Sequence, residues 1–253
     1  MFQNANRIKF NRPVDEAGRA WWIERFYGPF GLTPEGMGDL ITKSAVGDKL
    51  IIYDFIDGMG HAFRLRVEGS LSGPGEVWFV ERTFELSGNL FNADEMFVAD
   101  KIRGAGLGRR LMGDLIEACE TLQVDRIKIQ ARNIGRYAWL RMGFRPDMGS
   151  WIEMRKNLID ALLRFEEALG RDAAWRTAEM VAKGGPETAN VVASLEEPVP
   201  SRQLLDSFMR PVQVPLGKAL LLEWTGDWSG EFMLADPEMK RIATKYLRED
   251  AGD

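Results

Sequence analysis

The chain has 253 residues, of which 45% are hydrophobic, so it can bury one substantial core and carry an element beyond a minimal domain. Its 33 basic and 38 acidic residues are interspersed and give a net charge of −5, which excludes a broad basic surface for nucleic acid. A single cysteine, Cys119, and a single histidine, His61, exclude a disulfide scaffold and leave little for a zinc site, so we expect no metal.

The first part of the chain predicts a strand, two helices and a run of strands. Asp15 and Glu16 are typical of a helix start, and this helix is expected to end near Gly28. Thr33 and Pro34 fit the N-cap and the first position of a second helix that reaches residue 43. The predicted strands are 7–10, 49–56, 62–68, 76–86 and 91–98, with a hairpin turn at 57–60.

The middle of the chain predicts two helices around a further strand. A helix over 107–122 places Cys119 on an apolar face with Leu111 and Leu115, so we expect a core thiol and not a nucleophile. A strand over 126–131 and a helix over 134–142 follow.

Beyond Phe144 the pattern becomes helical and then rich in proline. The predicted elements are amphipathic helices at 157–169 and 172–183, a surface connection over 196–215, strands at 218–224 and 228–234, and a helix at 238–248. No apolar run reaches the length of a membrane span, and residues 1–6 lack a signal pattern. We therefore expect no membrane partner and a cytoplasmic location.

A glycine-rich run, Arg103-Gly104-Ala105-Gly106-Leu107-Gly108-Arg109, separates the strand-like residues 94–98 from the helix that follows. Glycines let the backbone bend without Cβ clashes. The first turn of a helix leaves N–H groups free, and their dipole favours phosphate. The run therefore predicts a cradle for a phosphorylated ligand.

The spacing argues against two of the known glycine-rich cradles. A nucleoside triphosphate loop needs a lysine and a hydroxyl residue after its last glycine, whereas Arg109 and Arg110 follow Gly108. A dinucleotide fingerprint needs a third glycine at position 109 and an acidic residue at the end of a second strand. Glu120 and Asp125 have about the right spacing but precede that strand.

Arg103, Gly106 and Gly108 fit the pattern [Q/R]-x-x-G-x-[G/A], which resembles the pyrophosphate loop of the GNAT superfamily of acetyl-CoA-dependent N-acetyltransferases. The strand at 126–131, then Asn133 and the Gly143-Phe144 pair extend the resemblance over residues 94–146. It implies an α/β (α+β) fold with a mixed, mostly antiparallel central sheet flanked by helices. We expect a single domain over 1–253, with a helical insertion or partner-facing lid at 155–215 and final strands and helix at 216–248.

The resemblance also implies a binding site for acetyl-CoA as co-substrate. The backbone of Gly104, Ala105, Gly106, Leu107, Gly108 and Arg109 would bind the pyrophosphate, with added charge from Arg103 and Arg109. The main chain at Phe97 and Val98 would pair with the pantetheine arm. Asn133 resembles the residue that contacts this arm, and it also fits an N-cap for the helix at 134–142.

The catalytic residues depart from the family pattern. The family's usual tyrosine acid is replaced by Trp139, whose indole N–H cannot release a proton at neutral pH. Tyr137 is the remaining candidate acid. Glu95 is the candidate base, with Asp94 and Glu85 as alternatives.

The resemblance predicts transfer of an acetyl group to an amine by direct attack, with a small-molecule or protein amine as acceptor. Acidic side chains near the 91–98 strand and at Glu196 and Glu197 suit a cationic amine. A homodimer fits this expectation. The alternative is a non-catalytic acyl-CoA-binding or interaction protein with a GNAT fold, which the missing tyrosine at 139 favours.

Overall fold

The computed structural model describes residues 1–56, 62–71, 75–85, 87–205 and 209–248. The chain forms two compact units. The first contains Met1–Lys128, Met233–Ala235 and Leu247–Asp253, and the second contains Ile129–Phe232 and Asp236–Tyr246. The predicted turn at 57–60 and His61 lie outside the described residues, and the assignment of 1–253 to one domain stays a prediction.

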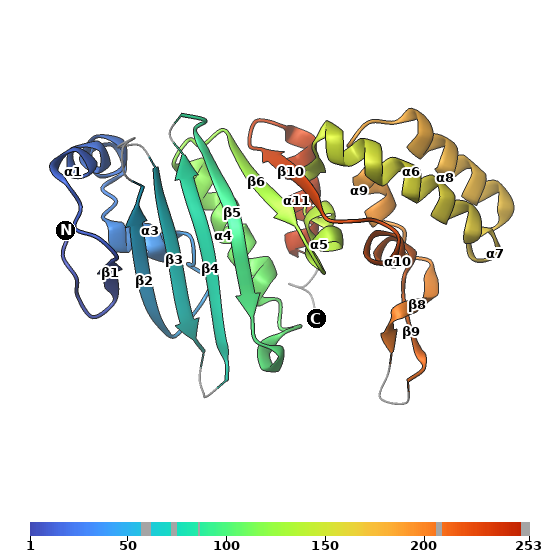
Figure 1. Cartoon of the computed structure of the whole chain (residues 1–253), viewed down its shortest axis with the longest axis horizontal. Helices are drawn as coiled ribbons and strands as arrows, with labels where there is room; N and C mark the ends of the chain where they lie inside the picture. Colours follow the sequence, from blue (N-terminus) through green and yellow to red (C-terminus); the bar gives the residue numbers. More distant parts are fainter. Residues whose placement is uncertain (57–61, 72–74, 86, 206–208, 249–253) are drawn as a thin grey trace. The chain divides into compact units, whose positions relative to one another are not determined.

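The first unit is built on a mostly antiparallel sheet (Figure 1). β1 runs parallel to β2, and each later strand runs antiparallel to the one before it. One row of partners across the strands is Ile8, Ile51, Val67, Val80 and Met96. The strands are β1 (Ile8–Phe10), β2 (Asp48–Phe55), β3 (Ala62–Ser70), β4 (Val77–Glu85) and β5 (Leu90–Val98).

The helices of this unit begin where the sequence predicts. The Asp15 carboxylate accepts from the Gly18 N–H at 2.7 Å and caps α1 (Glu16–Trp22), which continues as a π-helical turn, η1 (Ile23–Tyr27), and a short α2 (Gly28–Phe30). The Thr33 hydroxyl accepts from the Gly36 N–H at 3.0 Å and caps α3 (Pro34–Leu40). These contacts confirm both predicted helix starts.

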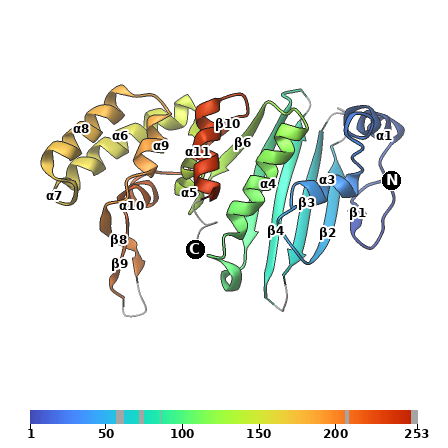
Figure 2. The ribbon, with the colours of Figure 1, turned by 180° about the vertical axis from the view of Figure 1, so that it is seen from behind.

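A second set of elements follows β5, namely η2 (Asp100–Ile102), α4 (Leu107–Thr121) and β6 (Arg126–Ala131). Figure 2 shows α3 and α4 in front of strands β2 to β5, and Figure 1 shows the opposite face of these strands without a helix of this unit before it. The core therefore lies on one side of the sheet. It is rich in aromatic rings, with centroids 4.8 Å apart for Trp22 and Phe26 and 5.2 Å apart for Phe26 and Phe84.

The second unit is mainly helical. Its helices are α5 (Gly135–Arg141), α6 (Met148–Arg164), α7 (Glu166–Leu169), α8 (Arg171–Lys183), α9 (Thr188–Ala193), α10 (Leu216–Glu223) and most of α11 (Pro237–Arg248). β7 (Arg145–Pro146) pairs antiparallel with β10 (Trp228–Met233). A separate two-stranded sheet contains β8 (Pro198–Leu205) and β9 (Pro211–Pro215).

The predicted strand at 218–224 is wrong, because this segment forms helix α10. A short apolar run cannot be assigned from periodicity alone, and its leucines and alanine favour a helix. Leu216, Ala219, Leu220 and Leu221 are all buried, so apolar residues surround much of the helix and no simple stripe appears. The predicted strand at 228–234 and the final helix are confirmed as β10 and α11.

Two further expectations for the second unit are corrected. The proline-rich segment, expected only as a surface connection, contains the paired strands β8 and β9. In a two-stranded sheet each strand has one edge free of ladder bonds, so a proline without an N–H group is tolerated there. The helix expected at 157 begins at Met148, because the Asp147 carboxylate accepts from the Ser150 N–H at 2.7 Å and caps it.

The fold class expected from the sequence is confirmed, since helices flank a mixed, mostly antiparallel sheet. Among the described residues, no helix is both long enough and apolar enough to cross a membrane.

Candidate functional site

The glycine run forms the connection from β5 to α4. Gly104 has φ of 93° and Gly106 has φ of 72°, both in the left-handed region that residues with a Cβ rarely adopt. Gly106 is the N-cap of α4 and supplies no capping side chain. The backbone therefore turns sharply before α4, as the predicted cradle requires.

The first turn of α4 carries the positive end of the helix dipole. The N–H groups at the start of a helix point away from its own carbonyl groups, and here they belong to Leu107, Gly108 and Arg109. No acidic residue lies in this turn, whereas α1 and α3 carry Glu16 and Glu35 there. The helix dipole and the backbone donors thus favour an anion at this end.

The arginines around the run contact its backbone. The Arg110 guanidinium donates from Nη1 to the Ala105 oxygen at 2.9 Å. Arg103 donates from Nη2 to the Val98 oxygen at 3.3 Å and pairs with Asp100 at 2.7 Å. These bonds hold the run against the end of β5, and the exposed Arg103 keeps its charge close to the cradle.

Gly108 of α4 faces the Met96 side chain of β5. A Cβ at this position would lie 3.5 Å from the Met96 Cε atom, which is ordinary contact distance. The helix therefore packs directly on the side chain of a strand residue next to the predicted pantetheine strand, Phe97 and Val98.

The ladder between β4 and β5 is irregular just before this strand segment. Glu81 lies opposite Glu95, and Arg82 lies opposite Ala93, so Asp94 has no partner residue on β4. Such a bulge interrupts the ladder and redirects the strand beyond it. Glu95, Phe97 and Val98 all follow the bulge.

The candidate bases differ in their partners. Asp94 accepts from the Thr83 hydroxyl at 2.7 Å, and burial raises the pKa of its carboxyl. Glu85 accepts from the Asn92 amide. Glu95 is exposed, and its carboxylate has no hydrogen-bond or ion-pair partner in the part of the chain that the structure describes. Of the three carboxylates, only that of Glu95 is not already bonded to a described residue.

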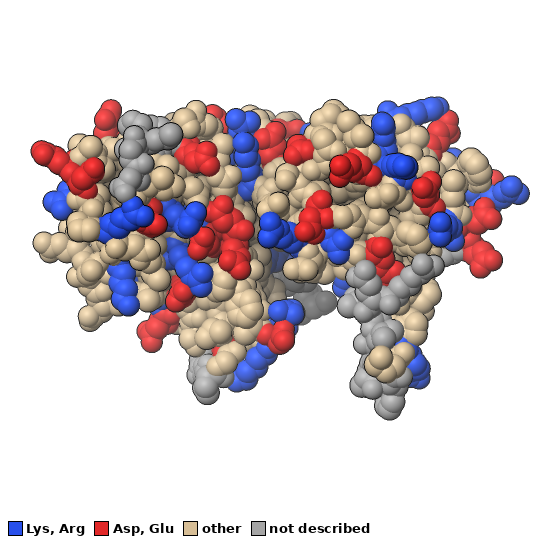
Figure 3. All heavy atoms as spheres, viewed as in Figure 1, with Lys and Arg blue, Asp and Glu red and all other residues tan. Residues whose placement is uncertain are grey.

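The uncovered face of the sheet carries mixed charge and aromatic rings. The Phe97 ring, 40% exposed, stacks on Phe79 at 5.6 Å, and the Arg66 guanidinium lies 3.8 Å from the Phe79 centroid. Arg66 also pairs with Glu68 at 2.6 Å. Figure 3 shows acidic and basic side chains interspersed over this face of the first unit, without an area of one sign.

Asn133 lies in the second unit, in the turn between β6 and α5. Its φ of 50° is left-handed, a conformation that asparagine tolerates better than most residues. The N-cap of α5 is Ile134, with no side-chain capping bond, so the alternative of an Asn133 cap is wrong. The exposed Asn133 side chain is not used in starting the helix.

Tyr137 lies on α5 beside Arg141. The Arg141 guanidinium donates to the Tyr137 hydroxyl at 3.3 Å and also pairs with Glu196. Burial raises the pKa of the Tyr137 phenol, and the neighbouring Arg141 opposes this shift only in part. The phenol therefore keeps its proton throughout the neutral range.

Trp139, at the family's usual tyrosine position, belongs to the core. It is buried, and its ring lies 5.3 Å from that of Phe144. Gly143 has φ of 87° and a Cβ there would meet the Met239 oxygen at 2.6 Å, so only glycine fits before Phe144. The absence of a side chain at Gly143 thus allows the end of α5 to pack closely on Met239 of α11 within the second unit.

Three residues that the sequence did not single out hold α5 in place. Asn190 of α9 is 7% exposed and donates to the Leu140 and Phe144 oxygens, at 2.8 and 2.9 Å. Arg136 of α5 donates to the Leu222 oxygen at 2.9 Å and to the Thr225 oxygen. Trp228 donates from its indole to the Arg136 oxygen at 3.1 Å. Sequence offered little signal, because the partners are main-chain atoms far along the chain.

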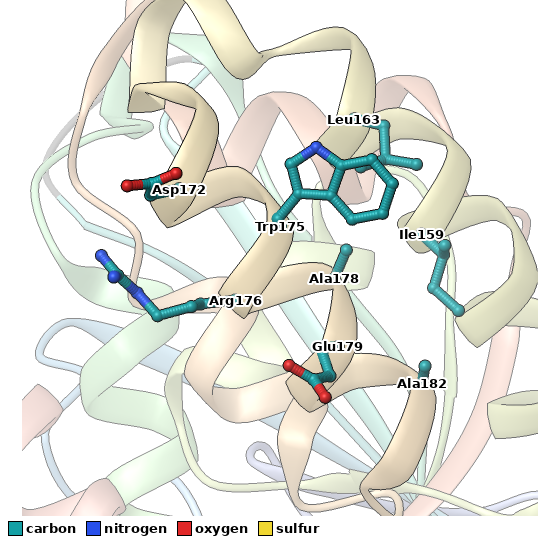
Figure 4. Close-up of a pocket in the computed structure, with 8 residues that line it drawn as sticks. All are labelled: Ile159, Leu163, Asp172, Trp175, Arg176, Ala178, Glu179 and Ala182. Carbon is teal, nitrogen blue, oxygen red and sulfur yellow. The ribbon is translucent and has the colours of Figure 1, made fainter.

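A groove with a cavity of about 590 Å³ lies between α6 and α8 (Figure 4). Ile159 and Leu163 line it from α6, and Trp175, Ala178 and Ala182 line it from α8. None of the residues predicted for cofactor binding or catalysis lines this groove.

One family model matches the segment that contains the glycine run. Residues 85–157 match the family model described as an acetyltransferase (GNAT) domain. A search of curated proteins gave no match. A solved structure titled "Crystal structure of Nourseothricin acetyltransferase" is similar at 21% identity and a TM-score of 0.29. That match covers 36% of this chain and 55% of the other, so the chain spans about half the length of that protein.

Residues 85–157 are thus similar to a GNAT acetyltransferase domain. The matched segment contains β5, the glycine run, α4, β6 and α5, which are the elements that carry the resemblance in the sequence.

Proposed function

We propose that the protein is an N-acetyltransferase that uses acetyl-CoA and transfers the acetyl group directly to an amine. The observation that carries the proposal is the left-handed glycine turn at the N-terminus of α4, which follows β5 and the short helix η2. A diphosphate needs several convergent donors, and the backbone of residues 104–109 supplies them without side chains. Arg103 and Arg109 add positive charge nearby.

The strand beyond the bulge supports the second part of the proposed site. An extended thioester arm is recognised well by main-chain hydrogen bonds along a strand. Phe97 and Val98 supply such a strand at the end of β5, and η2 separates them from the cradle. Asn133, whose side chain does not cap α5, is proposed as a further contact to the pantetheine arm.

The chemistry requires two proton movements. The amine nitrogen bonds to the thioester carbonyl carbon, the carbon–sulfur bond breaks, and the departing thiolate takes up a proton. Glu95 is proposed as the base that accepts the proton of the amine, directly or through water, because its carboxylate has no partner among the described residues.

Tyr137 is proposed as the acid that protonates the thiolate. Its raised pKa keeps the phenol protonated at neutral pH, and the Arg141 contact orients the hydroxyl. Trp139 is unsuited to the role, because its ring is buried and indole does not release a proton.

The acceptor is proposed to be a small-molecule or protein amine. The carboxylates of Asp94 and Glu95 lie next to each other on β5 and favour a cationic amine over an anionic one. The cytoplasmic location and the homodimer expected from the sequence stay predictions.

Two measurements test the proposal. Calorimetric titration with acetyl-CoA measures binding, and a thiol-reactive dye measures coenzyme A released with a panel of polyamines, aminoglycosides, amino acids and peptides. We expect binding in the micromolar range and thiol release that depends on at least one amine.

Binding without thiol release across the panel would favour the alternative, an acyl-CoA-binding protein that does not transfer the acyl group. The observation that favours this alternative is the buried Trp139, which stands where the resemblance expects a tyrosine acid. Failure to bind any acyl-CoA would overturn both functions.

A further inference from the structure

A guanidinium group is buried beneath the bulge in β5. Arg82 of β4 is 1% exposed and belongs to the set of residues that faces the helices, with Val80 and Phe84. Burial is the main cause that lowers its pKa, to about 10, and Asp94 opposes this shift. A charge of this kind is costly to bury unless its donors are satisfied.

Arg82 donates hydrogen bonds to main-chain oxygens of both strands next to the bulge. Its Nη1 atom donates to the oxygens of Glu81 and Glu95, each at 2.9 Å. These two residues lie directly opposite each other, next to the unpaired Asp94. One side-chain nitrogen thus bridges both strands at the irregularity.

The same guanidinium also contacts α4, the helix that begins at the glycine run. Its Nη2 atom lies 3.6 Å from the Met112 sulfur of α4. Met112 is one turn beyond Gly108, which packs on Met96. Two successive turns of α4 therefore connect to β5. Gly108 packs on Met96, and Met112 contacts Arg82, which bonds to the Glu95 oxygen.

The next residue of β4 holds the bulge from the other face of the sheet. The Thr83 hydroxyl donates to the Asp94 carboxylate at 2.7 Å. Side chains of successive strand residues point to opposite faces of the sheet. Arg82 and Thr83 therefore bond to the bulge from opposite faces. The segment beyond the bulge is Glu95 to Val98.

We propose that Arg82 is a positioning residue that fixes β5 beyond the bulge relative to the N-terminus of α4, and so aligns the two parts of the acyl-CoA site. This inference rests on the proposed function. An apolar side chain would fill the same volume without the cost of burying a charge, but it would leave the opposed carbonyls unbridged. The role of Arg82 is thus to set geometry, not to touch the substrate.

The test compares Arg82→Met and Arg82→Lys with a control on the same strand and face, Phe84→Leu, which creates a core defect on the other side of the bulge. For each, we would measure the acetyl-CoA Kd, the free energy of unfolding and the hydrogen exchange of amides 94–98 and 104–109. Arg82→Met should raise the Kd at least tenfold and speed exchange in both segments. Arg82→Lys, which keeps a cationic donor, should stay within about threefold.

Phe84→Leu should lower stability and leave the Kd unchanged, which separates positioning from general destabilisation. The inference is overturned if Arg82→Met binds acetyl-CoA within twofold of the wild-type Kd. It is also overturned if Arg82→Met and Phe84→Leu both lose affinity in proportion to their loss in free energy of unfolding. Should Arg82→Met not fold, Met112→Leu removes the sulfur contact alone and should raise the Kd two- to fourfold; no change would count against the inference. Absence of binding by the wild-type protein would instead defeat the proposed function itself.

Discussion

The side-chain amide of Asn190 donates from Nδ2 to the main-chain oxygen of Phe144, at 2.9 Å. The same nitrogen donates to the Leu140 oxygen at 2.8 Å. One residue of α9 thus bonds to two main-chain oxygens, one in the last turn of α5 and one just beyond its C-terminus. The helix that carries Tyr137 therefore depends on a residue from the segment 155–215.

Replacement of Asn190 by alanine should lower the free energy of unfolding by about 2–3 kcal/mol, because it removes the two hydrogen bonds that a buried side-chain amide donates to the Leu140 and Phe144 oxygens. Urea unfolding followed by tryptophan fluorescence measures the change. The neighbouring Val191→Ala, at a 44% exposed position, is the control and should change stability by less than about 0.5 kcal/mol. Equal effects of the two variants would contradict the assignment.

Gly104→Ala should weaken acetyl-CoA binding about tenfold, because the φ of 93° costs a residue with a Cβ about 1–2 kcal/mol. A Cβ at Gly104 has open space, so the loss would come from the backbone and not from a clash. The control is Gly113→Ala in the interior of α4, where a Cβ makes ordinary contact with Leu247 at 3.5 Å. That change should stabilise the protein by about 0.5–1 kcal/mol and leave the Kd unchanged.

Tyr137→Phe should lower kcat about 100-fold with a discovered acceptor, while KM for acetyl-CoA stays within about twofold. Steady-state thiol release measures both. A variant that turns over at the wild-type rate would remove Tyr137 from the mechanism.

The same variant has a predicted effect on stability at alkaline pH. The folded-state pKa of Tyr137 is raised above the ordinary value of 10.0, so the folded chain holds this proton more tightly than the unfolded chain. The contribution of this proton to the free energy of unfolding is fully present below pH 10. It is lost as the pH rises through the folded-state pKa of Tyr137. Tyr137→Phe should therefore lose less stability than the wild type above pH 10, as thermal unfolding in a pH series would measure.

Cys119 should not react with a thiol reagent in the native protein. The thiol is fully buried, and burial raises its pKa far above the usual range. We expect modification at least about a thousandfold slower than in urea, because reaction requires opening of the core. Rapid native labelling by a chromogenic disulfide would contradict a core position.

Local signals were enough to predict the first unit. Thr33 with Pro34 and Asp15 each marked a helix start, and the glycine run lay where its spacing placed it. Each of these signals acts within a few residues, so the chain alone displays it. The bulge at Asp94 carried no such signal, because a bulge depends on the register of two strands.

The second unit was harder to predict for the same reason. The apolar run 218–224 fits a strand or a buried helix equally well until its neighbours are known. Asn190 lies in a stretch for which the sequence predicted no element, and its role depends on carbonyls 46 and 50 positions earlier. Tyr137 could be named as a candidate, yet its contact with Arg141 and Glu196 required the fold.

The bonds around Arg136 also determine when α5 can gain its tertiary contacts during synthesis. Arg136 bonds to Leu222, Thr225 and Trp228, and Asn190 bonds to the end of α5. All four partners lie outside the matched segment 85–157. A ribosome must therefore release residue 228 before α5 has all its neighbours. A chain shortened to residue 157 would keep the family's recognised segment but expose the core side of the helix that carries the proposed acid.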